Sequence, residues 1–432
     1  MPTEEEADCL KYLLKTVIEM KKHLEVKTLW SKASFILLIL PVLILFVFFS
    51  SSPHGQQSNI LIGTEHKIQS RILGEERQYV VNLPSSYEKD EFYIQKKYPV
   101  LILLDGDSHF HSASGIIRYM GGNEQILEMI VVAVSNTNRT RDLTPTKSKT
   151  GIGGNNDAQA FATSGGSDNF FRFLETELLP QINKDYRTLP YRVLVGHSLG
   201  GLFAVDSFLN QRVFNAYIAI DPSLVWDDQA ILKKAKLILA NNKSFKSTLY
   251  IAQANNPFNE GKNAGTRGEA FQSFRASLAS NKSEGLRHSY AFFEHEDHFS
   301  VPLISLYQGL LFIFEGYKFP LNTLANKNAS DVKKHYEMFS QRVGVDIPPP
   351  GKLINGAASF LLYSEKKVDK AIELFKLNQE YYPKSSVTYS SLGDAYKVKG
   401  NKEMAIINYR KSLEINANNE PAKRSLKELT QN

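Results

Sequence analysis

The chain has 432 residues, enough for one large domain and a smaller one. Its formal net charge of +6 is modest, and no basic stripe with interleaved aromatic residues is present, so nucleic-acid binding is not indicated. Cys9 is the only cysteine, which excludes a disulfide within the chain and a cysteine-based metal site.

An apolar run near the amino terminus predicts a membrane span. Phe35–Phe49 is uninterrupted by polar residues, and with its flanks the stretch 34–52 reaches the roughly 17–20 residues that a spanning helix needs. Several lysines precede the run, whereas the first positive residue beyond it is Lys67. The positive-inside rule then predicts that residues 1–33 are cytoplasmic and that the main body is periplasmic or otherwise extracytoplasmic. A cleaved signal peptide and a buried core helix are the alternatives.

Residues 58–318 alternate apolar runs with segments of helical spacing. Alternating residues at 66–73 and 77–83 predict a hairpin. Apolar runs typical of buried strands lie at 98–104, 129–134, 191–195, 214–220, 247–252 and 288–293. This order predicts an α/β fold with a doubly wound, mainly parallel sheet, in which ligands bind at the carboxyl ends of the strands. The Gly-, Ser- and Asn-rich stretch 147–166 is expected to form a loop over that edge.

The sequence Gly196-His-Ser-Leu-Gly200 joins the strand at 191–195 to a helix that begins near residue 202. It fits the G-x-S-x-G nucleophile elbow, in which a sharp turn holds the serine in a strained conformation. Side chains two residues to either side of the serine would collide with the opposing backbone, which explains the glycines. Ser198 is therefore predicted to be a catalytic nucleophile. The alternative is a tight turn with a packed serine.

A serine nucleophile needs a general base, and in this fold the base histidine follows the serine in the chain. His298 lies just past the last predicted strand, where the loop returns to the sheet edge, and is the preferred candidate. His295 is the second candidate, while His288 opens a strand and is expected to face solvent or to pair locally. Both His295 and His298 could instead be surface residues of an acidic loop.

The oxyanion hole needs two backbone donors. The N–H of Leu199 is one, and the N–H of Asp107, in the turn after the strand at 98–104, is the predicted other. The acid that would orient the histidine is harder to place, because asparagines follow the strand at 247–252 where a carboxylate is expected. Glu260, Asp221 and a Ser–His dyad without an acid all stay open.

Arg139 and Arg141 follow the strand at 129–134 and therefore reach the same edge of the sheet. They are predicted to contact an anionic or catecholate-like substrate. Alternatively, they pair with Asp142 and hold the loop. The predicted chemistry requires no cofactor and no metal ion.

Five segments together resemble a known family. They are Tyr98–Gly106, Asn136–Pro145, Gly196–Gly201, Asp221–Trp226 and Asp297–Pro302. As a set they are similar to the "putative esterase" family of α/β-hydrolases, and most of all to its siderophore-esterase-like branch, over roughly residues 60–318. The resemblance implies Ser198 as nucleophile and His298 as base. The missing carboxylate after 247–252 departs from the usual triad, although a dyad is known within this branch.

Beyond residue 318 the predicted alternation of strands and helices ends. Residues 319–351 predict a linker with one helical segment and a rigid, proline-rich end. Residues 352–432 carry a repeat of period 34, in which Ala371 corresponds to Ala405 and Phe375 to Tyr409. These offsets predict a small all-α domain of tetratricopeptide repeats with a capping helix. Two repeats are few for a free-standing solenoid, so the domain is expected either to pack on the hydrolase or to bind a partner protein.

The sequence thus predicts a membrane-anchored serine esterase that hydrolyses small-molecule carboxylic esters, of which siderophore-type lactones are one class, through an acyl-enzyme. Two other functions stay open. One is an acyltransferase with the same machinery, in which an alcohol replaces water. The other is a non-catalytic scaffold that acts through its repeats.

Overall fold

The computed structural model describes residues 60–89, 96–149, 151, 159, 161–242, 244–255, 264–320 and 328–431. Nearly all of these belong to one compact unit, Ile62–Asn432. The predicted cytoplasmic segment 1–33, the predicted membrane span 34–52 and the candidate acid Glu260 lie outside the described residues. Within the described ranges, no helix is both long enough and apolar enough to cross a membrane.

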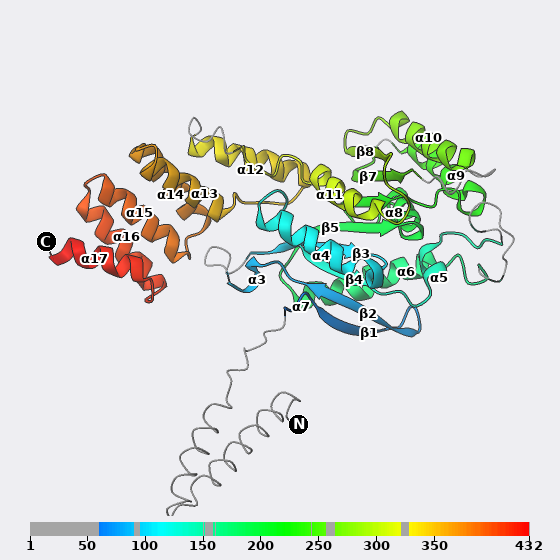
Figure 1. Cartoon of the computed structure of the whole chain (residues 1–432), viewed down its shortest axis with the longest axis horizontal. Coiled ribbons are helices and arrows are strands. Elements are labelled where there is room, and N and C mark those ends of the chain that lie inside the picture. The colour runs from blue at the N-terminus through cyan, green and yellow to red at the C-terminus, as the bar shows by residue number, and fades with distance from the viewer. Residues whose placement is uncertain are drawn as a thin grey trace, which may run out of the picture. The chain divides into compact units, whose positions relative to one another are not determined.

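Among the described residues, eight strands form one sheet in the order β1-β2-β4-β3-β5-β6-β7-β8 (Figure 1). Their bounds are β1 Thr64–Ser70, β2 Glu75–Asn82, β3 Tyr98–Leu103, β4 Ile130–Val134, β5 Thr188–His197, β6 Ala216–Ile220, β7 Ser247–Ala254 and β8 Leu286–Phe293. The β1–β2 and β2–β4 pairs are antiparallel, and every later pair is parallel. The predicted mainly parallel sheet with an amino-terminal hairpin is therefore confirmed.

Helices cover both faces of the sheet because successive strand residues point to opposite sides. Leu101 and Leu103 join the hydrophobic cluster formed with the helices at 106–122 and 301–313, whereas Val100 and Ile102 join the cluster formed with the helices between residues 167 and 280. The helices are α3 Ser86–Lys89, α4 Gly106–Gly122, α5 Arg139–Leu143, α6 Ser167–Phe173, the π-helical turn η1 Leu174–Leu178, α7 Leu179–Asp185, α8 Leu199–Leu209, α9 Trp226–Asn241, α10 Ala264–Ser280 and α11 Val301–Ile313. This is the layered arrangement of an α/β-hydrolase.

The carboxyl-terminal region is helical, as predicted. It comprises α12 Ala329–Val343, α13 Gly351–Tyr363, α14 Val368–Tyr381, α15 Ser386–Val398, α16 Lys402–Ile415 and α17 Glu420–Gln431. The residues predicted to form a linker contain α12, and its Tyr336 and Phe339 rings pack against the buried Tyr317 at centroid distances of 5.9 and 5.4 Å. This segment is therefore part of the folded unit rather than a free connection.

The helix pair α15 and α16 depends on a small residue at its contact. A Cβ atom on Gly393 would lie 2.8 Å from the ring of Tyr409, which is fully buried. Only glycine lets the ring approach this closely. This close contact joins the two helices, and their assignment to the tetratricopeptide class stays a prediction.

Candidate active site

The predicted elbow has the geometry that its glycines require. β5 ends at His197, Ser198 has φ of 61° and ψ of −116°, and α8 begins at Leu199. A Cβ atom on Gly196 would lie 2.1 Å from the carbonyl oxygen of Gly200, so any side chain there would collide with the backbone. For Gly200 the expected collision is also with backbone. Instead, a Cβ atom on Gly200 would lie 3.1 Å from the side-chain oxygen Oδ2 of Asp105. The strained serine is thus flanked by one close backbone approach, at Gly196, and one close side-chain approach, at Gly200.

His298 is oriented by a buried carboxylate. Its Nδ1 lies 2.6 Å from Asp221 Oδ2, and Asp221 is completely buried directly after β6. The backbone N–H of Ala254 donates to Asp221 Oδ1 at 3.1 Å, and the Arg267 guanidinium forms an ion pair with Oδ2. Asp221 was one of the open candidates for the acid, and it is the one that the structure brings to the histidine.

The environment of Asp221 keeps its carboxyl group ionised. Burial alone would raise the pKa of Asp221, but the hydrogen bond from His298 and the charge of Arg267 hold it below its ordinary value of 3.8. An ionised carboxylate only accepts hydrogen bonds, so Nδ1 of His298 must carry the proton. In the neutral imidazole Nε2 then keeps its lone pair, which is the form that a general base requires.

The histidine lies beside the elbow. The ring centroids of His298 and His197 are 4.4 Å apart, and His197 directly precedes the serine. Ser198 Oγ lies 3.4 Å from Ser223 Oγ, and the backbone N–H of Ser198 donates to Ile220 O at 3.0 Å. The carboxyl ends of β5, β6 and β8 therefore bring Ser198, Asp221 and His298 to one edge of the sheet, where ligands bind in such folds.

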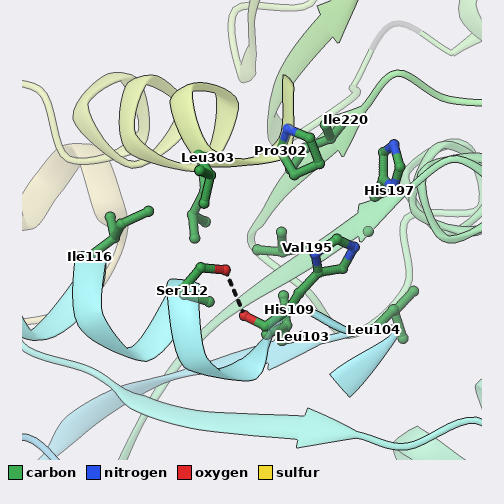
Figure 2. Close-up of a pocket in the computed structure, with 13 residues that line it drawn as sticks. Leu103, Leu104, His109, Ser112, Ile116, Val195, His197, Ile220, Pro302 and Leu303 are labelled. Carbon is green, nitrogen blue, oxygen red and sulfur yellow. Dashed lines mark hydrogen bonds between the residues drawn. The ribbon is translucent and has the colours of Figure 1, made fainter. Parts of the chain in front are cut away.

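Three histidine rings lie next to one another, and two of them line a small cavity. His197 lies between His298 and His109, whose ring centroid is 5.5 Å away. Burial lowers the pKa of His197 to about 3 and also lowers that of His109, so both rings are neutral near pH 7. The cavity holds about 20 Å³ and is lined by both rings, Ser112 and apolar side chains of β3, β5 and α11 (Figure 2). That volume accommodates one water-sized group.

The two predicted oxyanion donors both lie in the first turn of a helix. Leu199 is the first residue of α8, and Asp107 is the second residue of α4. Backbone N–H groups in the first turn of a helix have no acceptor within that helix, and the helix dipole favours negative charge there. Gly106 lets α4 begin close to the sheet, because a Cβ atom at this position would lie 3.0 Å from Val134 O. Both N–H groups thus belong to helix starts at the active edge.

Both arginines form ion pairs within the protein. Arg141 bonds to Glu75 at 2.5 Å and to Asp142 at 2.7 Å, which matches the alternative that it holds the loop. Arg139 Nε and Nη2 bond to the two carboxylate oxygens of Asp105 at 2.6 and 2.9 Å. The structure thus gives Arg141 a role in holding the loop and gives Arg139 a contact with the α4 turn, and contact of either guanidinium group with the substrate stays a prediction.

The second candidate for the base takes no part in this arrangement. His295 is exposed, and Asp221 contacts His298 instead. Sequence reasoning missed Arg267, because it follows a polar stretch with no pattern that ties it to the site. In the described part of the chain, no group of three or more His, Cys, Asp or Glu side chains is placed to hold a metal ion.

Comparison with known proteins agrees with this chemistry. Residues 70–259 match the family described as "Putative esterase". The ferri-bacillibactin esterase BesA of Bacillus subtilis is 28% identical over 227 residues, which are 50% of this chain and 78% of that protein. The crystal structure of an IroE-like serine hydrolase from Shewanella oneidensis has a TM-score of 0.65 and 29% identity, and the match covers 74% of this chain and 99% of that one. The chain is a serine hydrolase of carboxylic esters.

The fold of this hydrolase recurs together with its carboxyl-terminal helices. An uncharacterised protein from Capnocytophaga ochracea, 17% identical, matches 86% of this chain and 100% of its own with a TM-score of 0.57. Residues 58–318 are only 261 of the 432 residues, so the match extends beyond the sheet and its covering helices. The coverage is large enough that at least part of the carboxyl-terminal helical region is matched as well.

Proposed function

We propose that the protein hydrolyses carboxylic esters through an acyl-enzyme formed on Ser198. Ser198 Oγ attacks the ester carbonyl carbon, and Nε2 of His298 accepts its proton. The N–H groups of Leu199 and Asp107 hold the oxyanion. His298 then protonates the leaving alcohol, and a water molecule activated by the same nitrogen releases the acid. The observation that carries the proposal is the 2.6 Å contact of His298 Nδ1 with the buried Asp221, beside the strained serine.

Lactone esters of the siderophore type are the substrate class that we propose. Their support is the similarity to BesA, which is named as a ferri-bacillibactin esterase, and to a protein named as the apo-salmochelin esterase of Escherichia coli, 30% identical over 152 residues. The latter match covers 46% of that protein.

Two further parts of the proposal concern the ends of the chain. We propose that residues 34–52 anchor the protein in a membrane, with the hydrolase on the periplasmic or outer side, as the charge asymmetry indicates.

We also propose that residues 352–432 are tetratricopeptide repeats. The close contact of Gly393 with Tyr409 supports this assignment, and such repeats would offer a surface for a partner protein.

The test compares the parent with Ser198→Ala and His298→Ala on short p-nitrophenyl esters and on a ferric trilactone siderophore. We expect hydrolysis by the parent, its loss in both variants, and fluorophosphonate labelling that requires Ser198. Activity that persists in Ser198→Ala would refute the nucleophile. Preferential ester formation with added glycerol or sugar would instead identify an acyltransferase, and a folded parent without hydrolysis or labelling would identify a scaffold.

A further inference from the structure

The oxyanion hole of this enzyme is built from two separate pieces of backbone. Leu199 belongs to the elbow after β5, whereas Asp107 belongs to the turn after β3. Both N–H groups must point at one oxygen atom, and such donors act only when they lie about 2.7–3.1 Å from it. The hole therefore depends on whatever fixes the elbow and the α4 turn relative to each other.

One guanidinium group contacts both pieces. Arg139, the first residue of α5, binds both carboxylate oxygens of Asp105 at 2.6 and 2.9 Å. Its Nη2 also donates to the carbonyl oxygen of His197 at 3.1 Å. That carbonyl belongs to the peptide group that joins His197 to Ser198. Arg139 thus links the residue that precedes α4 to the peptide that precedes the nucleophile.

The carboxylate that Arg139 holds sits at a strained position. Asp105 is 4% exposed and has φ of 54°, a region that residues other than glycine seldom adopt. Asn136 secures the same turn, because its side chain donates to Asp105 Oδ1 at 2.7 Å and its backbone N–H donates to Asp107 Oδ2 at 2.9 Å. A strained turn persists only when its surroundings over-determine it, and here Arg139 and Asn136 do so.

We propose that Arg139 is a positioning residue that fixes the two halves of the oxyanion hole against each other. This inference rests on the proposed acyl-enzyme mechanism and adds a residue to it. The planar fork of arginine is essential to the role, since Nε and Nη2 together make three directed hydrogen bonds to two different segments. A lysine ammonium would keep the charge but could not reproduce that geometry.

The same contacts separate positioning from substrate binding. The charge of Arg139 is already paired with a buried carboxylate, so it offers little net attraction to an anionic substrate. A positioning residue affects the transition state of every ester alike, which lowers kcat with little change in KM. A residue that binds an anionic substrate would raise KM for that substrate alone.

The experiment uses the full-length chain with Arg139→Met and Arg139→Lys. The control is Arg118→Met, the same residue type on the exposed face of α4. Each protein is assayed on a neutral ester, p-nitrophenyl butyrate, and on an anionic ester, p-nitrophenyl hemisuccinate. We expect kcat to fall by about 10- to 100-fold on both esters in both Arg139 variants, because small displacements of catalytic groups have effects of this size. KM should stay within about twofold, and Arg118→Met should match the parent.

Asp105→Asn provides an independent readout. Because Arg139 acts through Asp105, the double variant Asp105→Asn/Arg139→Met should lose little more kcat than the worse single variant. If the two residues acted independently, the fold losses of the single variants would multiply. If Arg139→Met does not fold, Arg139→Lys carries the test. Unchanged kcat in a folded Arg139 variant, multiplied losses in the double variant, or a loss confined to KM for the anionic ester would overturn the proposal. Loss of the proposed function itself would show separately, as parent activity that survives Ser198→Ala.

Discussion

Replacing Asp221 by asparagine is the sharpest test of how the histidine is held. The substitution keeps the shape of the side chain but replaces one acceptor oxygen by an NH₂ group. The backbone N–H of Ala254 donates to Oδ1 and so holds the remaining oxygen there, which leaves the NH₂ group at the Oδ2 position that His298 and Arg267 share. The NH₂ group then faces Nδ1 of His298 and donates to it. The ring proton moves to Nε2, and the nitrogen that should accept the serine proton is blocked.

The size of the effect follows from this change of tautomer. A wrong imidazole tautomer in a serine–histidine–aspartate triad lowers kcat on the order of 10⁴-fold. That factor corresponds to about 5 kcal/mol of transition-state stabilisation, at about 1.4 kcal/mol for each factor of ten. A dyad that needs no acid would predict only a small change, so the two mechanisms differ by orders of magnitude in kcat.

Stability must be measured beside activity, because Asp221 also neutralises Arg267. Removing one partner of a buried ion pair costs roughly 3–5 kcal/mol. Arg267→Met is the matched control, since it removes that pair while leaving the bond between Asp221 and His298. We expect Arg267→Met to lose stability in urea unfolding and to lose far less kcat on p-nitrophenyl butyrate than Asp221→Asn does. Asp221→Asn activity within tenfold of the parent, together with a large loss in Glu260→Gln, would refute the assignment of Asp221 as the acid.

Three other predictions concern packing and pH. Gly196→Ala should abolish fluorophosphonate labelling and lower the yield of folded protein, because its Cβ would lie 2.1 Å from Gly200 O; Gly115→Ala, with open space around it in α4, should leave labelling intact. Because the pKa of His197 is low in the folded state, the unfolded state binds more protons between about pH 6.5 and pH 3. The free energy of unfolding should therefore fall on acidification by up to about 1.4 kcal/mol per pH unit. In urea unfolding, His197→Asn should make this pH dependence flatter. The lowered pKa of Asp221 adds stability that is present above pH 3.8 and is lost as the pH falls through its folded value, so Asp221→Asn should flatten the stability curve below pH 3.8.

The fold and the elbow could be predicted because both follow from local pattern. All-apolar runs mark buried parallel strands, and glycine at position 196 reflects a contact with Gly200, which is close in sequence. The acid could not be chosen in the same way. Asp221 follows β6 and His298 follows β8, so their contact depends on sheet order and on how the last loop returns, which no local pattern fixes.

The asparagine that occupies the expected place of the acid has its own structural task. The side chain of Asn255 donates to Glu294 O at 2.9 Å, and its backbone N–H donates to Phe293 O at 3.1 Å. It therefore ties the end of β7 to the end of β8. At a position that joins two strand ends in this way an amide side chain is favoured, because it can donate a hydrogen bond to a carbonyl oxygen. An ionised carboxylate cannot. The missing acid in the sequence thus reflects a different use of this position rather than a degenerate site.

The pairing of charges at the active edge explains how buried carboxylates and an oxyanion can coexist there. Asp105 and Asp221 are both almost wholly buried, and each is matched by an arginine, Arg139 and Arg267. A negative charge that develops on the substrate oxygen would be repelled by an unpaired carboxylate nearby. Neutralising both leaves the backbone N–H groups and helix starts of α4 and α8 as the dominant field at that oxygen. On this argument the arginines favour the reaction by cancelling charge, and a neutral ester benefits as much as an anionic one.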